Sequence, residues 1–341
     1  MQMLVWRVGW CALWMVLWWP HARAAAQPVT RAMLDQSLAL GRQFLLASQL
    51  PTGLFRYNVH VLTGEVAAEE NAVRQAGALW GLALIHQDQP SAETREAVLR
   101  GLAFFAQHSQ LTPEGGRYIR FPHDSSGDSG VVALTTLTLI DFLRAEPAAE
   151  HAALRQQLAE YLRFLQSLER PDHRFCGQYL ALTSGRGWGE PSPYFDGEIL
   201  LALVKAARHL QRDDLQPLVL RAAEATSAAY AGDALRQQRD DPATKGYFQW
   251  GCLAYLELHA TQWPGTQQYA QRAIELAHWM IDVHRTLERT RNTGYAYEGI
   301  IAAYSLALAV DDAPSQEKFR RVIDTGLARL STWQVGSAQA T

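Results

Sequence analysis

Cysteine is scarce in this sequence, with three residues among 341, and neither a C-x-x-C nor an H-E-x-x-H pattern is present. Structural zinc sites use Cys and His ligands at such spacings, so no metal site is predicted. Two of the cysteines, Cys176 and Cys252, lie far from the N-terminus. Because spacing alone does not show whether they meet, one disulfide and two buried thiols both remain open.

Long apolar runs are also lacking, apart from one near the N-terminus. There Arg7 precedes twelve apolar residues, Val8 to Trp19, followed by Pro20 and the Ala-rich segment 22–26. This order is typical of a secretory signal peptide, predicted at residues 1–26. Twelve residues are too few for a membrane-spanning helix, which needs about 20. The sequence therefore predicts a periplasmic or secreted protein whose mature chain, residues 27–341, has no membrane span.

Basic runs are absent as well. Removing the two arginines of residues 1–26 takes the net charge from −3 to −5, which argues against nucleic acid as a partner. No G-x-S-x-G elbow, P-loop or dinucleotide fingerprint occurs. Serine-based hydrolysis and nucleotide chemistry are therefore not supported, and no cofactor is predicted.

Helical periodicity dominates what is present. One set of predicted helices is long and amphipathic: 30–49, 91–109, 150–168, 213–231, 265–284 and 314–333. A second set is shorter, rich in Ala and Gly and apolar on nearly every side: 71–87, 129–144, 196–210, 248–261 and 297–310. Only residues 53–64 alternate as a strand would, which predicts a short hairpin or an extended loop.

The two sets alternate strictly, and helices that are apolar all round are buried. A buried ring of helices inside an exposed ring is an all-α fold, the α/α toroid. Six outer and five inner helices predict an incomplete or full (α/α)6-type barrel of helix hairpins, formed as a single domain by residues 27–341. An open solenoid is the alternative.

Acidic residues gather at the starts of the inner helices. In a toroid these ends open on one side, so their side chains are expected to surround one cleft. Paired carboxylates across a cleft are what glycosidic bond cleavage needs. The candidate catalytic residues are Asp128, Asp196, Glu198 and Glu298. The alternative is that these acids are helix caps and ion pairs.

Candidate substrate-binding residues lie in the same segments: Glu70, Arg74, Asp124, Trp188, Glu190, Tyr194, Trp250 and Tyr297. The aromatic rings would stack on sugars, although Trp250 would serve equally well in the core. Arg74 would hold a substrate carboxylate. It follows Glu70 by four residues, so an ion pair within the helix is the alternative.

Four segments carry a resemblance to a known superfamily: 71–83, 127–134, 193–203 and 295–304. Together they resemble the α/α six-hairpin glycosidases and their toroid relatives, which include uronate epimerases and polysaccharide lyases. The resemblance covers nearly the whole mature chain, but no catalytic acid can be carried over from one family. It implies an exported carbohydrate-active enzyme without a cofactor.

Three functions remain open. A glycoside hydrolase acting on a poly- or oligosaccharide is the leading hypothesis. In a uronate lyase or C5-epimerase, Tyr194 or Tyr297 would act on the C5 proton, and Arg74 would bind the sugar carboxylate. A non-catalytic toroid would bind a glycan or a partner of an envelope assembly.

Overall fold

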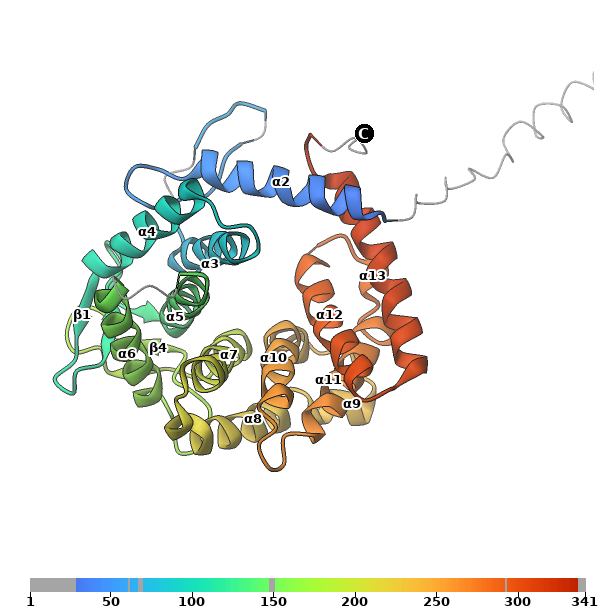
Figure 1. Cartoon of the computed structure of the whole chain (residues 1–341). Coiled ribbons are helices and arrows are strands. Elements are labelled where there is room, and N and C mark those ends of the chain that lie inside the picture. The colour runs from blue at the N-terminus through green and yellow to red at the C-terminus, as the bar shows by residue number, and fades with distance from the viewer. Residues whose placement is uncertain (1–28, 61, 67–69, 147–150, 292, 337–341) are drawn as a thin grey trace, which may run out of the picture.

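The computed structural model of the chain describes residues 29–60, 62–66, 70–146, 151–291 and 293–336. The predicted signal peptide lies outside the described residues. Twelve α-helices of the described residues form two concentric rings (Figure 1). The predicted α/α toroid is therefore confirmed.

The outer ring contains the amphipathic helices, close to the predicted positions. These are α2 (Arg31–Ser48), α4 (Ala92–Gln107), α6 (Ala152–Ser167), α8 (Gln216–Tyr230), the short α9 (Gly232–Gln237), α11 (Gln268–Asp282) and α13 (Ala313–Trp333). The ends of the ring meet where the Ser37 hydroxyl donates to Gln334 Oε1 at 2.5 Å, and Gln334 Nε2 donates to the Ser37 carbonyl at 2.9 Å.

Five helices form the inner ring, as predicted. They are α3 (Ala72–Asp88), α5 (Ser129–Ala145), α7 (Pro193–Leu210), α10 (Pro242–Thr261) and α12 (Thr293–Ala309). The predicted starts of the last three, at residues 196, 248 and 297, were too late. Proline at the first helical position needs no hydrogen-bond partner, so Pro193 and Pro242 begin helices rather than preceding them. Asp241 caps α10 by accepting bonds from the Ala243 and Thr244 amides.

Between α12 and α3, no helix of the described residues stands in the inner ring (Figure 1). Apolar side chains on this side remain partly exposed, including Leu84 at 37%, Ile301 at 40% and Leu308 at 48%. On α5, which has inner neighbours on both sides, every residue from Ser129 to Leu143 is buried. The toroid is thus a six-hairpin ring with one inner position unfilled by the described residues.

Short strands lie among the connecting loops. β1 (Ser109–Leu111) and β2 (Arg117–Ile119) form a hairpin, while β3 (Gly127–Asp128), β4 (Gln178–Tyr179) and β5 (Gly187–Trp188) form an antiparallel sheet in the order β3-β4-β5. Neither sheet was predicted, because strands of two or three residues are too short to show alternation. Two isolated antiparallel bridges involve the predicted 53–64 segment: Phe55 pairs with Gln49, and Val59 pairs with Val66.

Glycine allows the inner helices to approach closely at one contact between α7 and α10. A Cβ placed on Gly197 would lie 2.4 Å from the Cβ of Trp250. Such a contact forces the two helices apart, so we expect Gly197→Ala to lower the free energy of unfolding by about 1–3 kcal/mol. Urea unfolding followed by circular dichroism measures this loss.

Gly81 on α3 is the matched control, because a Cβ there would meet no heavy atom within 4 Å. Gly81→Ala is expected to be neutral or to stabilise the protein by up to about 1 kcal/mol, since alanine favours helices over glycine. Equal losses in the two variants would contradict the packing explanation.

Cys176 and Cys252 are free thiols. Cys252 is buried in α10 and donates weakly to the Ala273 carbonyl, while Cys176 is partly buried beside Gly187. In the part of the chain that the structure describes, no helix is both long and apolar enough to cross a membrane.

Candidate active site

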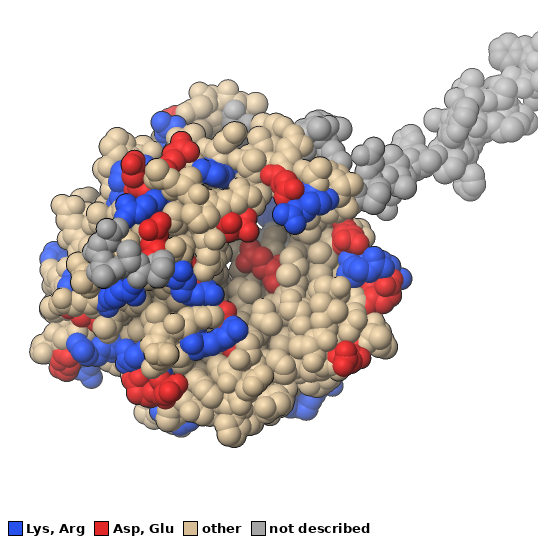
Figure 2. All heavy atoms as spheres, in the orientation of Figure 1, with Lys and Arg blue, Asp and Glu red and all other residues tan. Residues whose placement is uncertain are grey.

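The N-terminal ends of the inner helices border one cavity of about 670 Å³. Four inner helices contribute side chains to it, from Arg74 on α3 to Tyr295 on α12, and Asp128 contributes from the residue just before α5. The lining residues are Asn71, Val73, Arg74, Asp128, Tyr194, Phe195, Glu198, Lys245, Gln249, Trp250 and Tyr295. Figure 2 shows that the centre of the ring is hollowed and that acidic atoms lie inside it. Helix N-termini carry partial positive charge, so their convergence stabilises negative charge in this space.

Glu198, in the second turn of α7, is the most unusual of these residues. Its side chain is only 3% exposed, and its Oε2 atom has no hydrogen-bond partner. Burial raises the pKa of this carboxyl well above its ordinary value, and the nearby charge of Asp128 raises it further. A buried carboxyl without a partner holds its proton at neutral pH. Glu198 is therefore suited to donate a proton into the cavity.

The backbone opposite Glu198 leaves room for this carboxyl. A Cβ on Gly130, in the first turn of α5, would lie 2.4 Å from Glu198 Oε2 and 2.5 Å from the Phe195 ring. Glycine at this position thus lets the carboxyl lie directly against the start of α5. The Asp-Ser-Gly sequence at the start of α5 places Asp128 two residues before the glycine against which the Glu198 carboxyl packs.

Asp128 is the last residue before α5 and is half-buried, but its side chain makes no capping bond to the helix. It lies in a row across the small sheet, paired with Gln178, which in turn pairs with Trp188. Gln178 Nε2 donates to Asp128 Oδ1 at 3.3 Å. Trp188 is 46% exposed and donates to the Ser126 hydroxyl at 3.2 Å. The sheet thus fixes Asp128 at the cavity and holds an exposed indole two strands away.

Two cations reach the cavity, each beside a tyrosine. Arg74 donates to the Tyr57 hydroxyl at 2.5 Å and lies over its ring at 5.4 Å. Lys245 donates to the Tyr194 hydroxyl at 3.1 Å and lies over that ring at 5.6 Å. The structure gives no ion pair between Glu70 and Arg74; Arg74 contacts Tyr57 on the preceding loop instead.

Glu298 lies at the edge of the cavity. Its carboxylate accepts a bond of 2.5 Å from Gln249 Nε2, and Gln249 itself lines the cavity. Surrounding protein raises the pKa of Glu298 even though its side chain is open to solvent, while the bond from Gln249 opposes that rise. Unlike Glu198, this carboxyl has a fixed partner.

Trp250 lies both at the cavity and in the core. It lines the cavity, is 6% exposed and packs against Trp80 with ring centroids 5.5 Å apart. Asp124 is exposed. Its pKa is raised, first by partial burial of the carboxyl group and then by the charge of Asp128 nearby. Glu70 is exposed just before α3.

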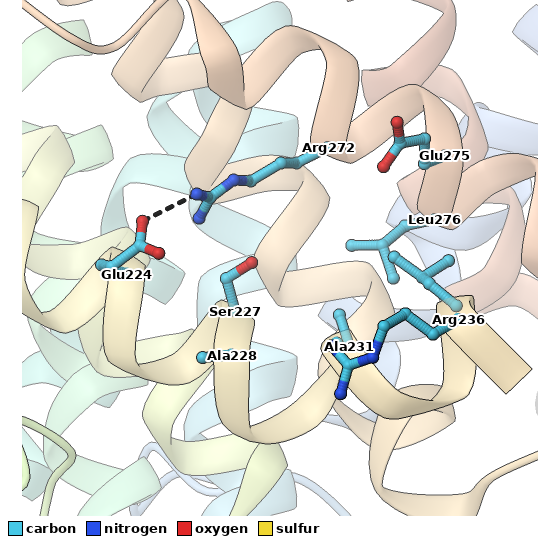
Figure 3. Close-up of a pocket in the computed structure, with 10 residues that line it drawn as sticks. Glu224, Ser227, Ala228, Ala231, Arg236, Arg272, Glu275 and Leu276 are labelled. Atoms are coloured by element: carbon cyan, nitrogen blue, oxygen red, sulfur yellow. Dashed lines mark ion pairs between the residues drawn. The ribbon is translucent and has the colours of Figure 1, made fainter.

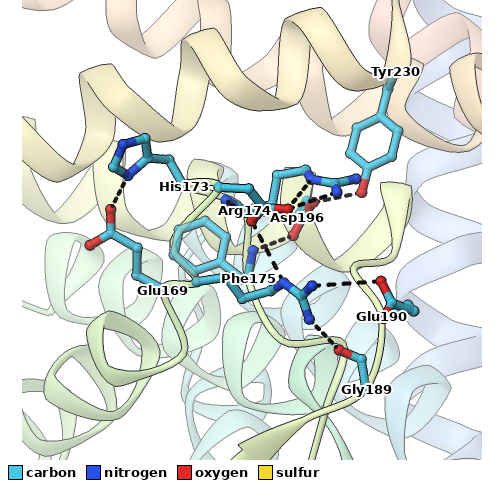
Figure 4. Close-up of polar contacts among 10 residues, drawn as sticks. Glu169, His173, Arg174, Phe175, Gly189, Glu190, Asp196 and Tyr230 are labelled. Atoms are coloured by element: carbon cyan, nitrogen blue, oxygen red, sulfur yellow. Dashed lines mark hydrogen bonds and ion pairs between the residues drawn. The ribbon is translucent and has the colours of Figure 1, made fainter.

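Asp196 lies in the wall between α7 and the outer ring, beside Tyr230 at the end of α8 (Figure 4). Its Oδ1 accepts from the Phe175 amide at 3.0 Å, and its Oδ2 accepts from the Tyr230 hydroxyl at 2.6 Å. Residues two apart on a helix do not share a face, so Asp196 and Glu198 cannot serve one cleft. Burial raises the pKa of Asp196 to about 7, against the lowering effect of these bonds. Asp196 fixes the start of α7 and is outside the cavity.

Two other predicted residues also lie elsewhere. Glu190 is exposed at 87% of its side chain and pairs with Arg170 at 3.6 Å on the loop before α7 (Figure 4). Tyr297 is buried against α13, where a Cβ on Gly326 would be 2.0 Å from its ring. Both residues therefore belong to the supporting structure.

The sequence interpretation missed Tyr57, Gln178, Lys245, Gln249 and Tyr295 as site residues. Lys245 lies in the first turn of α10, which was predicted to begin six residues late. Tyr57 and Gln178 reach the site only through loop folding. The alternation of residues 53–64 was the one signal available for Tyr57.

A separate hollow of about 340 Å³ lies on the outer wall between α8, α9 and α11 (Figure 3). The ion pair between Arg272 and Glu224, 2.7 Å long, crosses one side of it. None of its lining residues belongs to an inner helix. Its charged side chains already have hydrogen-bond or ion-pair partners. Among the described residues, no three His, Cys, Asp or Glu side chains are grouped as metal ligands.

No model of a known protein family matches the sequence, and no curated protein sequence matches it. Solved structures do match the α/α toroid fold. A sugar epimerase from a ruminal bacterium matches with a TM-score of 0.62 and 13% identity over 87% of this chain and 86% of that one. A D-mannose isomerase matches at 0.63 and 14% identity over 89% and 86%.

A GH76 α-mannanase from Bacteroides thetaiotaomicron matches with a TM-score of 0.56 and 13% identity, covering 79% of this chain and 87% of that one. At such low identities the similarity establishes the fold alone. The predicted resemblance to this group of toroids is thereby confirmed for the architecture.

The protonation of Glu198 has a consequence for stability. A carboxyl whose pKa is raised on folding favours the native state most at low pH, and this advantage is lost as pH rises from the unfolded value toward the folded one. Relative to Glu198→Gln, the native protein is therefore expected to lose free energy of unfolding as the pH rises from 4.5 through neutrality. Urea unfolding across this range measures the difference. Glu190→Gln should give a curve parallel to that of the native protein, and a parallel curve for Glu198→Gln would contradict the burial argument.

Proposed function

We propose that the protein is a glycoside hydrolase that cleaves a poly- or oligosaccharide between Glu198 and Asp128. The observation that carries this proposal is the buried, unpartnered carboxyl of Glu198 next to a second carboxyl in one cavity. Glycosidic cleavage needs a carboxylic acid to protonate the leaving oxygen and a second carboxyl group on the other side of the bond.

In this mechanism Glu198 transfers its proton to the glycosidic oxygen while the bond from that oxygen to the anomeric carbon breaks. Asp128 either takes a proton from the attacking water or attacks the anomeric carbon itself, and the configuration of the first product distinguishes these routes. Gln178 holds Asp128 in place, and the lining residues Tyr194 and Trp250 offer aromatic surfaces for sugar rings. The exposed indole of Trp188 lies outside the lining and would offer a further surface. The names of the similar structures, which are all sugar-acting enzymes, support a carbohydrate substrate.

The test is incubation of purified residues 27–341 with a panel of neutral and acidic polysaccharides in normal and heavy water, followed by mass spectrometry. Products that gain one water are expected. Unsaturated products short of one water would replace the proposal with a lyase, and deuterium uptake without cleavage would replace it with an epimerase. Binding without any chemical change would indicate a glycan-binding toroid.

We also propose that the protein acts in the periplasm or outside the cell after removal of residues 1–26. The sequence of the signal segment supports this location. Expression of the full chain in a bacterial host, followed by N-terminal sequencing of the periplasmic fraction, should give a mature start near Gln27. An uncleaved chain retained in the cytoplasm would exclude it.

A further inference from the structure

Two positively charged side chains, Arg74 and Lys245, line the cavity. They are placed on different inner helices, at the first turns of α3 and α10. Within the described residues, neither forms an ion pair with a carboxylate; each is held instead by a tyrosine hydroxyl. Arginines elsewhere commonly have acidic partners, as Arg117 has in Glu160 at 2.7 Å.

The charge of the lining follows from its four ionisable acids and bases, Arg74, Lys245, Asp128 and Glu198. With both carboxyls ionised the lining would be neutral. Burial keeps Glu198 protonated, so Arg74 and Lys245 face one charged carboxylate among the lining residues, that of Asp128. The Glu298 carboxylate at the edge is held by Gln249. The five helix N-termini add partial positive charge to the same space. An anionic ligand is therefore favoured over a neutral one.

The two cations also have the geometry to hold an anion without releasing their tyrosines. Arg74 donates to Tyr57 through Nη1, so the other edge of its guanidinium remains available for a carboxylate. The planar guanidinium matches the two oxygens of a carboxylate. Lys245 has three N–H donors and uses one of them on Tyr194.

We infer that the substrate is an acidic glycan, whose hexuronic acid residues present a carboxylate to Arg74 and Lys245 while a glycosidic bond lies at Glu198 and Asp128. This inference rests on the proposed function and adds the class of substrate. It identifies Arg74 and Lys245 as specificity-determining residues that do not take part in bond cleavage.

A pair of substrates with the same backbone tests the inference: a uronic-acid oligosaccharide and the same oligosaccharide with its carboxyl groups reduced to alcohols. Wild-type protein is expected to cleave the acidic form with at least tenfold higher kcat/KM. Arg74→Met and Lys245→Met are each expected to lower kcat/KM on the acidic form by about 10–100-fold, since hydrogen bonds to charged groups are worth about 1.5–3 kcal/mol. Both variants should lose a much smaller factor on the reduced form, because it has no carboxylate for them to bind. Arg320→Met, on the exposed face of α13, is the control and should behave as wild type.

Equal cleavage of the two forms, with no effect of either variant, would overturn the acidic-glycan inference and leave the hydrolase proposal intact. A sulfated neutral oligosaccharide that is cleaved as well as the uronate would overturn the assignment to a carboxylate. Calorimetric binding to Glu198→Gln separates the two proposals. Salt-sensitive binding of the acidic form alone, without turnover by wild type, would support the inference while removing hydrolysis.

Discussion

Replacing Glu198 with glutamine is expected to lower glycan turnover by about 10²–10⁴-fold while the protein stays folded, because positioned general acids contribute about this much. Glutamine keeps the shape of the side chain but has no proton to give. Since Oε2 of the buried Glu198 has no partner, the substitution breaks no hydrogen bond at this atom. Initial rates by reducing-sugar assay, together with circular dichroism, measure both parts of the expectation.

The nature of the leaving group sharpens this test. An aryl glycoside with an acidic phenol leaves without protonation, so Glu198→Gln should lose far less activity on it than on a natural glycan. Glu190→Gln is the matched control, because Glu190 is on the same loop but exposed and paired with Arg170. Unchanged turnover of the natural glycan by Glu198→Gln would remove this residue from the mechanism.

Replacing Lys205 with methionine is expected to lower the free energy of unfolding by about 3–5 kcal/mol, as breaking a buried ion pair does. Lys205 on α7 is 6% exposed, and its Nζ donates to both oxygens of Asp141 on α5, at 2.6 and 2.7 Å. Asp141 is completely buried and also accepts from Trp80 Nε1 at 2.9 Å. Removing the ammonium leaves that carboxylate without its closest positive partner. Urea unfolding measures the loss.

The double variant Asp141→Asn, Lys205→Met should recover much of this stability, because it leaves no unpaired buried charge. Lys318→Met is the surface control. Lys318 pairs with Asp282 at 2.6 Å, but the two side chains are 27% and 54% exposed, so its loss should cost less than about 1 kcal/mol. A loss no larger for Lys205→Met than for Lys318→Met would contradict the importance of burial.

The architecture could be predicted because each helix contains its own periodic signal. Ala- and Gly-rich segments that are apolar all round must be buried, and amphipathic segments must cover them, so their alternation leads to two rings. The boundaries were less accurate. The predicted starts of α7 and α10 came after the proline that occupies the first helical position in both.

The candidate site was predicted only in part. Asp128, Glu198, Arg74, Tyr194 and Trp250 lie at the cavity because they begin inner helices, and a toroid brings those ends together. Asp196 and Tyr297 share the same local sequence pattern but point to the outer ring. Which face of a helix is turned to the centre depends on the packing of its neighbours, and the helices are too apolar all round for a sequence to mark that face.

The sequence by itself determined the two rings, the number of inner helices and the side on which their acidic starts meet, because periodicity and helix order are local properties. Only the tertiary structure decided which acids share the cavity. The reason is that burial, a missing partner and a neighbouring charge arise from contacts between segments far apart in the chain. Glu198 acquires its raised pKa from Gly130, Phe195 and Asp128 packed around it, whereas Asp196, two residues earlier, is bound by Phe175 and Tyr230.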